Sequence, residues 1–203
     1  MKKFGLVVIG AHFGVWLNDD LARFDKENIL LVEPVPYNYK KLKKRFINSK
    51  NIQICINAIF SEHKTSKFYF VKENSIQKLG KHWASGIGSF NKNHILDHRT
   101  KRFKIEEEDI DEIEIDFITF DNLTENYSIE SIDKLQIDVE GAEYEILKSI
   151  DYKKININSI LFESKHFDGT FKEGKKLEEI KKKLISEGYK LNQIDNENIL
   201  AVK

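Results

Sequence analysis

The chain has 203 residues, and its 33 lysines plus arginines balance its 33 aspartates plus glutamates, so its formal net charge is zero. This length is typical of one domain, and the lack of a basic excess argues against a nucleic-acid partner or an anionic membrane surface. The single cysteine, Cys55, excludes an internal disulfide, so we expect a cytoplasmic location. No apolar run reaches the roughly 20 residues of a membrane span, and the apolar start is shorter than a signal peptide needs.

The first 60 residues alternate short apolar runs with helical patterns. The runs at 4–9, 29–32 and 52–60 predict buried strands, because they are continuous and rich in β-branched residues. Apolar residues at helical spacing predict a helix over 15–24 and another that begins near Pro36. This βαβαβ order predicts a parallel sheet with right-handed crossovers.

The middle of the chain has a different character. Residues 67–72 alternate as a strand does, whereas the polar, glycine-containing stretch 73–103 predicts a long loop or a small insertion. The acidic stretch 106–114 predicts a solvated segment. Residues 114–120 again alternate, which predicts a strand able to pair antiparallel with 68–71.

The alternation of strands and helices returns in the last third. The expected elements are strands at 135–139 and 157–162, a short helix at 143–150, a helix through 177–185 that ends before Gly188, and a hairpin of strands at 189–194 and 198–202. We therefore predict an α/β, Rossmann-like fold whose sheet is mostly parallel with a C-terminal antiparallel hairpin. The prediction is a single domain over 1–203 with an insertion at about 67–118.

A glycine-containing turn follows the first predicted strand. Gly10 lets the chain turn sharply and lets a ligand approach the backbone, and the helix after Gly14 presents unpaired N–H groups that suit a carboxylate or a phosphate. Glu33 ends the next strand, 19 residues past Gly14, where a carboxylate can accept both hydroxyls of a ribose.

The spacing of the glycines bears on which cofactor fits. A dinucleotide fingerprint has glycines at positions that correspond to 10, 12 and 15, but this chain has His12 and Val15 there. The loop therefore favours a smaller anion, such as the carboxylate of an amino acid. A plain packing turn and a nicotinamide-dependent oxidoreductase remain the alternatives.

Four blocks of residues, in order, carry a resemblance to a known family. They are Gly10-Ala11-His12-Phe13-Gly14, then Val32-Glu33-Pro34-Val35-Pro36-Tyr37-Asn38, then Asn57-Ala58, and finally Thr119-Phe120-Asp121-Asn122-Leu123 with Ile137-Asp138-Val139-Glu140-Gly141-Ala142-Glu143. With them, the sequence resembles the FkbM family of methyltransferases from residue 4 to residue 203. The resemblance implies a class I methyltransferase fold, S-adenosylmethionine as methyl donor and, usually, transfer to a hydroxyl oxygen.

The resemblance also implies roles for individual residues. The cofactor-binding residues that it implies are Gly10, Ala11, His12 and Gly14 at the methionine end, Glu33 with Pro34 at the ribose, Asn57 and Ala58 near the adenine, and Asp138 at the reacting end. Two residues depart from the family pattern, which has aspartate at Val8 and lysine at Gln136. A non-catalytic cofactor-binding or interaction domain is therefore a further alternative. Relatives often carry a covering helix before the first strand, so a partner subunit in a homo-oligomer is a candidate lid.

Methyl transfer to an alcohol is helped by a base, and several acidic side chains end predicted strands. Asp138 and Glu140 are the first candidates, because two nearby carboxylates raise one another's pKa. Either residue is alternatively a cap of the helix that follows. Glu163 and His166 are the second and third candidates, and a lone loop histidine is often only solvated.

The insertion offers substrate-binding candidates. Trp83 is suited to stack on a sugar ring or, alternatively, to anchor the insertion, and Ser89 ends a glycine-rich stretch with free backbone N–H groups. His94 and His98 lie four residues apart, but no third ligand has convincing spacing, so we expect no metal. The prediction is O-methylation of a hydroxyl on a sugar, glycan or other small natural product, without a nucleic-acid partner.

Overall fold

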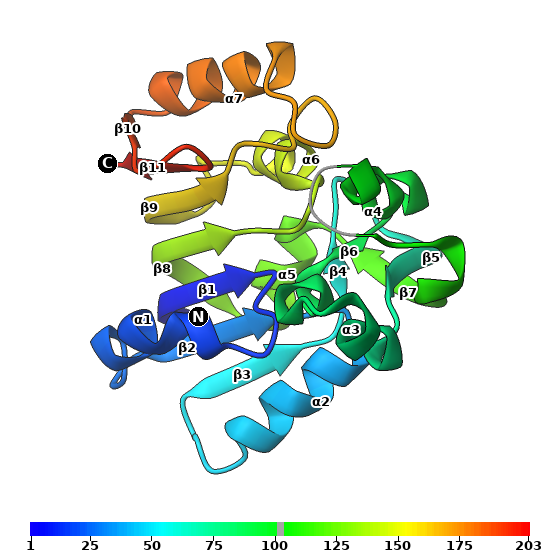
Figure 1. The fold of residues 1–203 in the computed structure, drawn as a ribbon. Helices are drawn as coiled ribbons and strands as arrows, with labels where there is room; N and C mark the ends of the chain where they lie inside the picture. Colours follow the sequence, from blue (N-terminus) through cyan, green and yellow to red (C-terminus); the bar gives the residue numbers. More distant parts are fainter. Residues whose placement is uncertain (101–103) are drawn as a thin grey trace.

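The computed structural model describes residues 1–100 and 104–203, and it contains a seven-stranded sheet with the order β10-β11-β9-β8-β1-β2-β3 (Figure 1). Its strands are β1 (Lys2–Ile9), β2 (Asn28–Val32), β3 (Ile52–Cys55), β8 (Ile129–Ile137), β9 (Asn156–Glu163), β10 (Lys190–Gln193) and β11 (Asn198–Val202). The pairs from β3 through β9 are parallel, and β11 is antiparallel to both of its neighbours. The predicted fold class, including the C-terminal hairpin, is confirmed.

Helices cover both faces of this sheet. They are η1 (Val15–Leu17), α1 (Asn18–Arg23) and α2 (Pro36–Arg45) on one face and α5 (Phe120–Asn126), α6 (Glu143–Ser149) and α7 (Lys175–Ser186) on the other. In β1, Leu6 and Val8 pack toward the first group, whereas Val7 and Ile9 pack toward the second. Burial on both faces explains why β1 is a continuous apolar run. No helix within the described ranges is long and apolar enough to cross a membrane.

A smaller sheet, with the order β4-β7-β5-β6, is built mostly from the middle of the chain. Its strands are β4 (Ala58–Ile59), β5 (Lys64–Val71), β6 (Gly88–Ser89) and β7 (Ile110–Ile118). The predicted antiparallel pairing is confirmed, because Phe68 pairs with Ile113 and Val71 with Ile110. However, β7 begins inside the stretch expected to be a solvated segment. Its acidic residues alternate with isoleucines that pack on the apolar cluster of this sheet.

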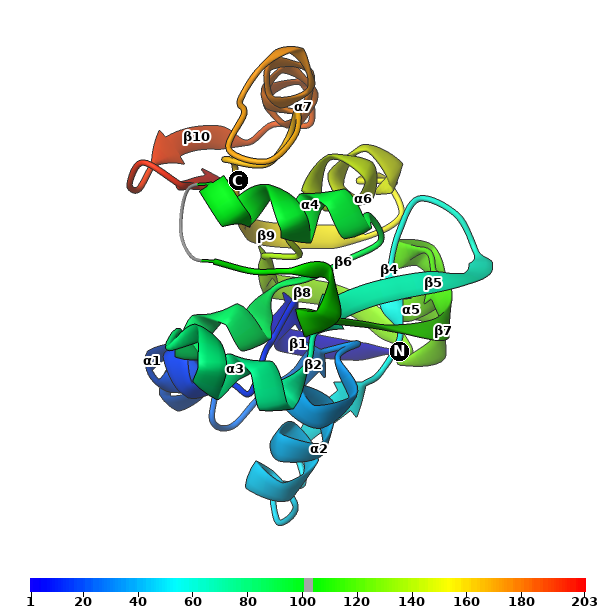
Figure 2. The same ribbon diagram turned by 45° about the vertical axis from the view of Figure 1, so that its right-hand side comes forward.

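The stretch expected to be a long loop or a small insertion contains regular structure. Its helices are α3 (Glu73–Leu79), η2 (His82–Gly86), α4 (Lys92–Asp97) and η3 (His98–Thr100), and η4 (Glu107–Asp109) follows. Residues 101–103, also part of that prediction, lie outside the described residues. A separate apolar cluster that includes Val71, Ile87 and Ile95 holds these short helices together. The carboxyl ends of β1, β8 and β9 point toward this segment, which Figure 2 shows from a second side.

The third predicted strand is two strands in different sheets. Cys55 ends β3 in the large sheet, and Ala58 begins β4 in the small one. Between them the chain turns at Ile56 and Asn57, and the Asn57 side-chain amide donates to the carbonyl of Asp116. The prediction of one strand over 52–60 was therefore wrong, because apolar periodicity does not show a change of sheet. The break places Asn57 at the junction of the two sheets.

Candidate active site

The turn after β1 is fixed by its neighbours on both sides. Gly10 has a φ of +90°, and a Cβ atom added there would lie 1.7 Å from the carbonyl oxygen of Asp138. The N–H groups of Gly10 and Ala11 both donate to the carbonyl of Val32, at 3.0 and 2.9 Å. Only glycine fits at position 10, because the backbone there lies between the ends of β2 and β8.

Glu33 ties this turn to the end of β2. Its Oε2 accepts from the N–H of His12 at 2.7 Å, and its Oε1 accepts from the N–H of Val35 at 2.9 Å. The side chain is almost fully buried, and burial raises the pKa of Glu33 to about 7 despite these two hydrogen bonds and a third from the Asn38 side chain. The three donors leave part of the acceptor capacity of the carboxylate for a ligand.

Helix η2 lies against the glycine turn. The hydroxyl of Ser85 donates to the carbonyl of His82, and it contacts Nε2 of His12 at 2.5 Å. The buried Asn38 amide donates to the carbonyl of Ser85 at 2.7 Å. Burial, with the charges of neighbouring Lys41 and His82, lowers the pKa of His12 to about 4. A neutral His12 therefore carries its proton on Nε2, which donates to Ser85.

One pocket, which we call the glycine-loop pocket, brings together six of the nine predicted cofactor-binding residues and one predicted substrate residue. Its lining includes Gly10, Glu33, Pro34, Asn57, Ala58, Ser89 and Asp138. In this structure its cavity volume is about 40 Å³, well below that of a typical ligand site. Ala11, His12 and Gly14 do not line it: Ala11 is buried, His12 contacts η2, and Gly14 precedes η1.

Three carboxylates gather at the Asp138 end of this pocket. The ligand oxygens of Asp138, Glu143 and Glu163 lie within 4.8 Å of one another. Glu143 accepts from the N–H groups of Val139 and Gly141, and burial raises its pKa to about 7. Burial and the neighbouring carboxylates raise the pKa of Glu163 to about 10, and it pairs with Lys165. Of these acids, only Asp138 lines the pocket.

The alternative in which Asp138 or Glu140 caps the following helix was wrong. Helix α6 begins at Glu143, its N-cap position is Ala142, and no side chain caps it by a hydrogen bond. Glu143 instead reaches back to the two N–H groups on either side of Glu140. Its carboxylate therefore holds the loop in the tightly turned form that the positive φ angles of Glu140 and Gly141 show.

The comparisons with known proteins agree with this geometry. The family model of the methyltransferase FkbM domain matches residues 9–191. This chain belongs to the FkbM methyltransferase family. It is therefore a methyltransferase, and its methyl donor is S-adenosylmethionine. No curated protein matches the chain by sequence.

Solved structures with similar folds have low sequence identity to the FkbM chain. A precorrin-6y C5,15-methyltransferase from Geobacter metallireducens is 12% identical, with all of this chain and 82% of that chain covered and a TM-score of 0.48. A Methanococcus jannaschii fibrillarin is 14% identical, with 99% and 66% covered and a TM-score of 0.47. Aeropyrum pernix fibrillarin with natively bound S-adenosyl-L-methionine is 13% identical, with 98% and 66% covered and a TM-score of 0.46. Likenesses of this degree add nothing to the family assignment.

The residues of the FkbM chain fit the family's cofactor. The turn at Gly10 exposes backbone where a side chain would otherwise lie, and Glu33 keeps lone pairs beside it. The departure at Val8 lies elsewhere: its side chain is fully buried in the apolar cluster with Leu6 and Leu17, and it does not line the pocket. An aspartate at position 8 would therefore meet an apolar environment in this chain.

Three predicted catalytic residues, which are Glu140, Glu163 and His166, and one substrate residue lie outside the pocket lining. Glu140 and His166 face His94 and His98 in a separate group, next to the pocket rather than in it. Trp83 packs against the apolar cluster of the middle segment, as its structural alternative predicted. The stacking role assigned to Trp83 therefore has no support from its position.

Three residues of this region were not given a role by the sequence. Glu143 was part of a matched block, and its two backbone hydrogen bonds give that match a physical reason. Ser85 lies in the glycine-rich stretch but has no pattern that predicts its contact with His12. Asn38, the last residue of the second matched block, is fully buried and holds Ser85 in place.

Proposed function

We propose that this methyltransferase transfers the methyl group of S-adenosylmethionine to a hydroxyl oxygen of a sugar, a glycan or another small natural product. The supporting observation is that Asp138 lines the same pocket as the Gly10 turn and Glu33. A base and the cofactor-binding groups thus share one enclosed space at the carboxyl ends of β1, β2 and β8. Ligands of open α/β sheets bind at such strand ends.

The proposal gives each group around the cofactor a task. Glu33 accepts hydrogen bonds from the ribose hydroxyls with the acceptor capacity that His12, Val35 and Asn38 leave. Asn57, at the junction of the two sheets, lies at the adenine end. When bound, the cofactor supplies an electrophilic methyl group on its sulfonium.

Entry of the cofactor requires a movement of η2 in this proposal. With a cavity volume of about 40 Å³, the pocket is too narrow for an adenosyl compound as it stands. The contacts that close it on this side run from Ser85 to His12 and Asn38. Helix η2 therefore acts as the cover that relatives build before their first strand, and it excludes water once the cofactor is bound.

Asp138 accepts the proton of the acceptor hydroxyl. Asp138 is the acid of this group that lines the pocket, whereas burial raises the pKa values of its neighbours Glu143 and Glu163. A positioned base contributes about 10² to 10⁴ in rate, and alignment of the two substrates contributes roughly 7 to 11 kcal/mol in favourable cases.

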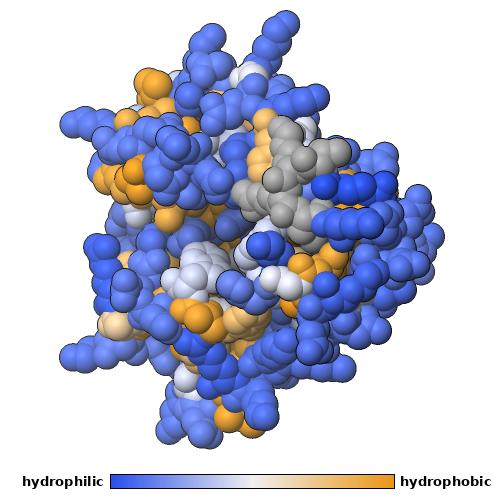
Figure 3. Space-filling model, in the orientation of Figure 1, coloured by the Kyte–Doolittle hydropathy of each residue, from blue (hydrophilic) through white to orange (hydrophobic). Residues whose placement is uncertain are grey.

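The surface near the site supports a polar acceptor. The face of the molecule in Figure 3 is mostly hydrophilic where the structure describes it, and its hydrophobic residues form small groups. A lipid-like acceptor favours a larger apolar patch. Ser89, in the pocket lining, is the group we assign to the acceptor. The single, buried Cys55 fits a cytoplasmic site of action.

Calorimetric titration tests the cofactor site. We expect S-adenosylhomocysteine to bind the wild-type chain and NAD not to bind, and Glu33→Ala to weaken binding about tenfold or more, because it removes the ribose acceptor. Glu130→Ala, at an exposed glutamate of β8, is the matched control and binds as the wild type does. Equal affinity of Glu33→Ala and the control excludes the ribose contact.

A turnover assay on a panel of saccharide and small hydroxylated acceptors tests the reaction. Asp138→Asn should lower turnover about 10² to 10⁴-fold and change cofactor affinity little, because the amide keeps the shape of the carboxylate but accepts no proton. Asp111→Asn, at an exposed residue of β7, is the control. Full activity of Asp138→Asn would show that another residue is the base. Cofactor binding without turnover on any acceptor supports the non-catalytic alternative.

A further inference from the structure

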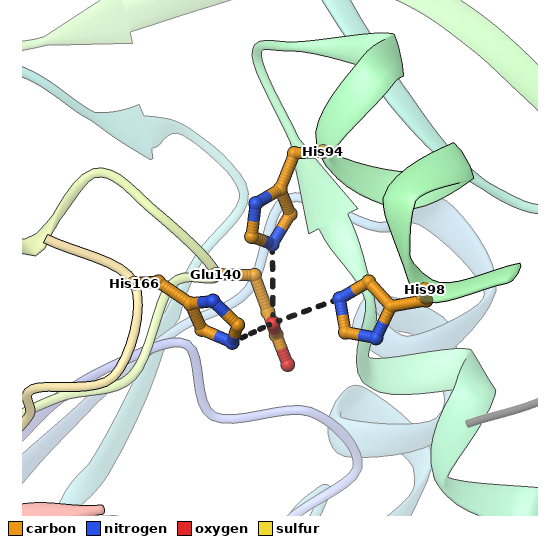
Figure 4. Close-up of side chains that lie close together, drawn as sticks. All are labelled: His94, His98, Glu140 and His166. Atoms are coloured by element: carbon orange, nitrogen blue, oxygen red, sulfur yellow. Dashed lines mark hydrogen bonds and ion pairs between the residues drawn. The ribbon is translucent and has the colours of Figure 1, made fainter. Parts of the chain in front are cut away.

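Three histidines and one glutamate meet beside the glycine-loop pocket, in what we call the histidine cluster. His94 lies on α4, His98 begins η3, Glu140 lies in the loop after β8, and His166 lies in the loop after β9 (Figure 4). The histidine side chains are at most 6% exposed and the glutamate side chain is 14% exposed. Burying these polar groups is unfavourable unless they are paired or bind a cation.

All three rings point toward one oxygen atom. The Oε2 atom of Glu140 lies 3.3 Å from Nε2 of His94, 3.3 Å from Nε2 of His166 and 3.7 Å from Nε2 of His98 (Figure 4). Tetrahedral zinc with bonds of about 2.0–2.2 Å holds its ligand atoms about 3.3–3.6 Å apart. The spacing around Oε2 therefore matches that of ligands around one ion.

The hydrogen bonds of His94 determine which of its nitrogens carries a proton. The hydroxyl of Thr170 donates to Oδ2 of Asp97 at 3.3 Å, so its oxygen accepts from Nδ1 of His94 at 2.9 Å. The proton therefore lies on Nδ1, and the lone pair of Nε2 faces the carboxylate of Glu140. A cation between Nε2 and Oε2, either a metal ion or a second ring proton, satisfies both atoms. A ligand histidine that donates from its other nitrogen is the usual arrangement at metal sites.

His98 presents a second imidazole to the same point. It follows His94 by four residues, so both side chains lie on one side of the α4–η3 turn. A histidine pair at this spacing is a common way for one helix to supply two ligands. The reason for expecting no metal was the missing third ligand, and the fold supplies it from the loop after β8.

His166 has a different role, because its Nδ1 atom accepts a hydrogen bond. The N–H of Phe171 donates to Nδ1 of His166 at 3.0 Å. A neutral His166 ring therefore carries its proton on Nε2, which lies 3.3 Å from Oε2 of Glu140. His166 is thus placed to orient the carboxylate and not to bind an ion through Nε2.

We propose that His94 Nε2, His98 Nε2 and Glu140 Oε2 bind a divalent transition-metal ion of the zinc type, with His166 as the positioning residue for Glu140. Two imidazoles and one carboxylate suit zinc, cobalt or nickel, whereas magnesium and calcium prefer oxygen ligands. Three protein ligands leave a coordination position open for water or a substrate oxygen. A hollow lined by His94, His166 and Ser89 adjoins the cluster, and Ser89 also lines the glycine-loop pocket.

Metal binding is tested on the full chain without cofactor, so the result does not depend on the acceptor or on methyl transfer. The chain is treated with a chelator, desalted and titrated with Co²⁺ and Zn²⁺. We expect one ion per chain by elemental analysis, and visible absorption bands of four-coordinate cobalt that Zn²⁺ abolishes. Mg²⁺ should not compete. No retained ion, or binding that Mg²⁺ displaces, overturns the proposal.

Variants identify the ligands. His94→Gln, His98→Gln and Glu140→Gln should each weaken zinc binding about 100-fold or more, and His166→Gln should weaken it about 10-fold to 100-fold while one ion per chain still binds. His63→Gln, at an exposed histidine, is the matched control and binds zinc as the wild type does. Wild-type affinity in the three ligand variants refutes the assignment, and complete loss in His166→Gln refutes its positioning role.

A second measurement covers variants that fold poorly. Zinc should raise the melting temperature of the wild type and of His63→Gln, because an ion that binds only the folded chain stabilises it. It should leave the melting temperatures of the ligand variants unchanged. Equal zinc-induced shifts in wild-type and ligand variants contradict the proposal even where absolute stabilities differ.

Discussion

The glycine-loop pocket and the histidine cluster are each organised around a largely buried glutamate. The groups that contact the two glutamates are of different kinds. Glu33 accepts hydrogen bonds from two backbone N–H groups at adjacent strand ends. Glu140 faces imidazole side chains that come from two helical turns and a distant loop. Every non-proline residue supplies a backbone N–H, so the first site needs little beyond strand order. The second depends on which side chains the fold brings together.

The largest effect expected from this comparison is a loss of stability on substitution of Gly10 in the glycine-loop pocket. Gly10→Ala should lower the free energy of unfolding by roughly 3 kcal/mol or more, because its Cβ atom meets the carbonyl of Asp138. Gly188→Ala has nearly the same φ, +91° against +90°, with nothing within 4 Å of the added atom. It should lose only about 1–2 kcal/mol. Urea unfolding of both variants checks the difference. Equal losses of unfolding free energy would show that contact with the Asp138 carbonyl does not destabilise Gly10→Ala.

The next effect is the pH dependence of stability that Glu33 contributes. Its pKa is about 7 in the folded chain and 4.5 as the ordinary value, so the folded chain holds more protons between these values. The stability contribution of Glu33 is therefore fully present below about pH 4.5 and is lost as the pH rises through 7. It amounts to about 3 kcal/mol at most. Glu33→Gln should reduce the fall in unfolding free energy between pH 5 and pH 7.5, and an unchanged fall argues against a raised pKa.

The smallest effect is expected where the cover meets the glycine turn. Ser85→Ala removes the contact with His12, and it should lower stability by about 0.5–1.5 kcal/mol. In stopped-flow binding, S-adenosylhomocysteine should associate and dissociate a few-fold faster, because η2 opens more readily. Ser66→Ala, at a half-buried position of β5, is the control. Unchanged rates in Ser85→Ala separate this contact from cofactor entry.

The sequence predicted the parts of the molecule whose patterns are local. The buried strands around β1, the turn at Gly10 and the acid at the end of β2 each follow from a short run of residues. The helices of the middle segment did not, because Val71, Ile87 and Ile95 meet only after the chain folds back on itself. The start of β7 was not predicted, because the acidic residues between its isoleucines indicated a solvated segment.

The histidine cluster shows the same limit at the level of a site. The spacing of His94 and His98 was visible, but Glu140 follows His94 by 46 positions, and His166 lies beyond another strand. No periodicity relates residues so far apart. The sequence also could not show that His94 is a ligand and His166 a hydrogen-bond donor. This distinction depends on the contacts of the two rings with Thr170 and Phe171.

The clamp formed by Glu143 has a consequence for communication between the two regions. It fixes the N–H groups of Val139 and Gly141, which flank Glu140, and the carbonyl of Asp138 lies close to the backbone at Gly10. A backbone movement at Glu140 is therefore transmitted to Asp138, two residues earlier, and from there to the Gly10 turn. The histidine cluster and the methyl-donor site thus share one stiff connection.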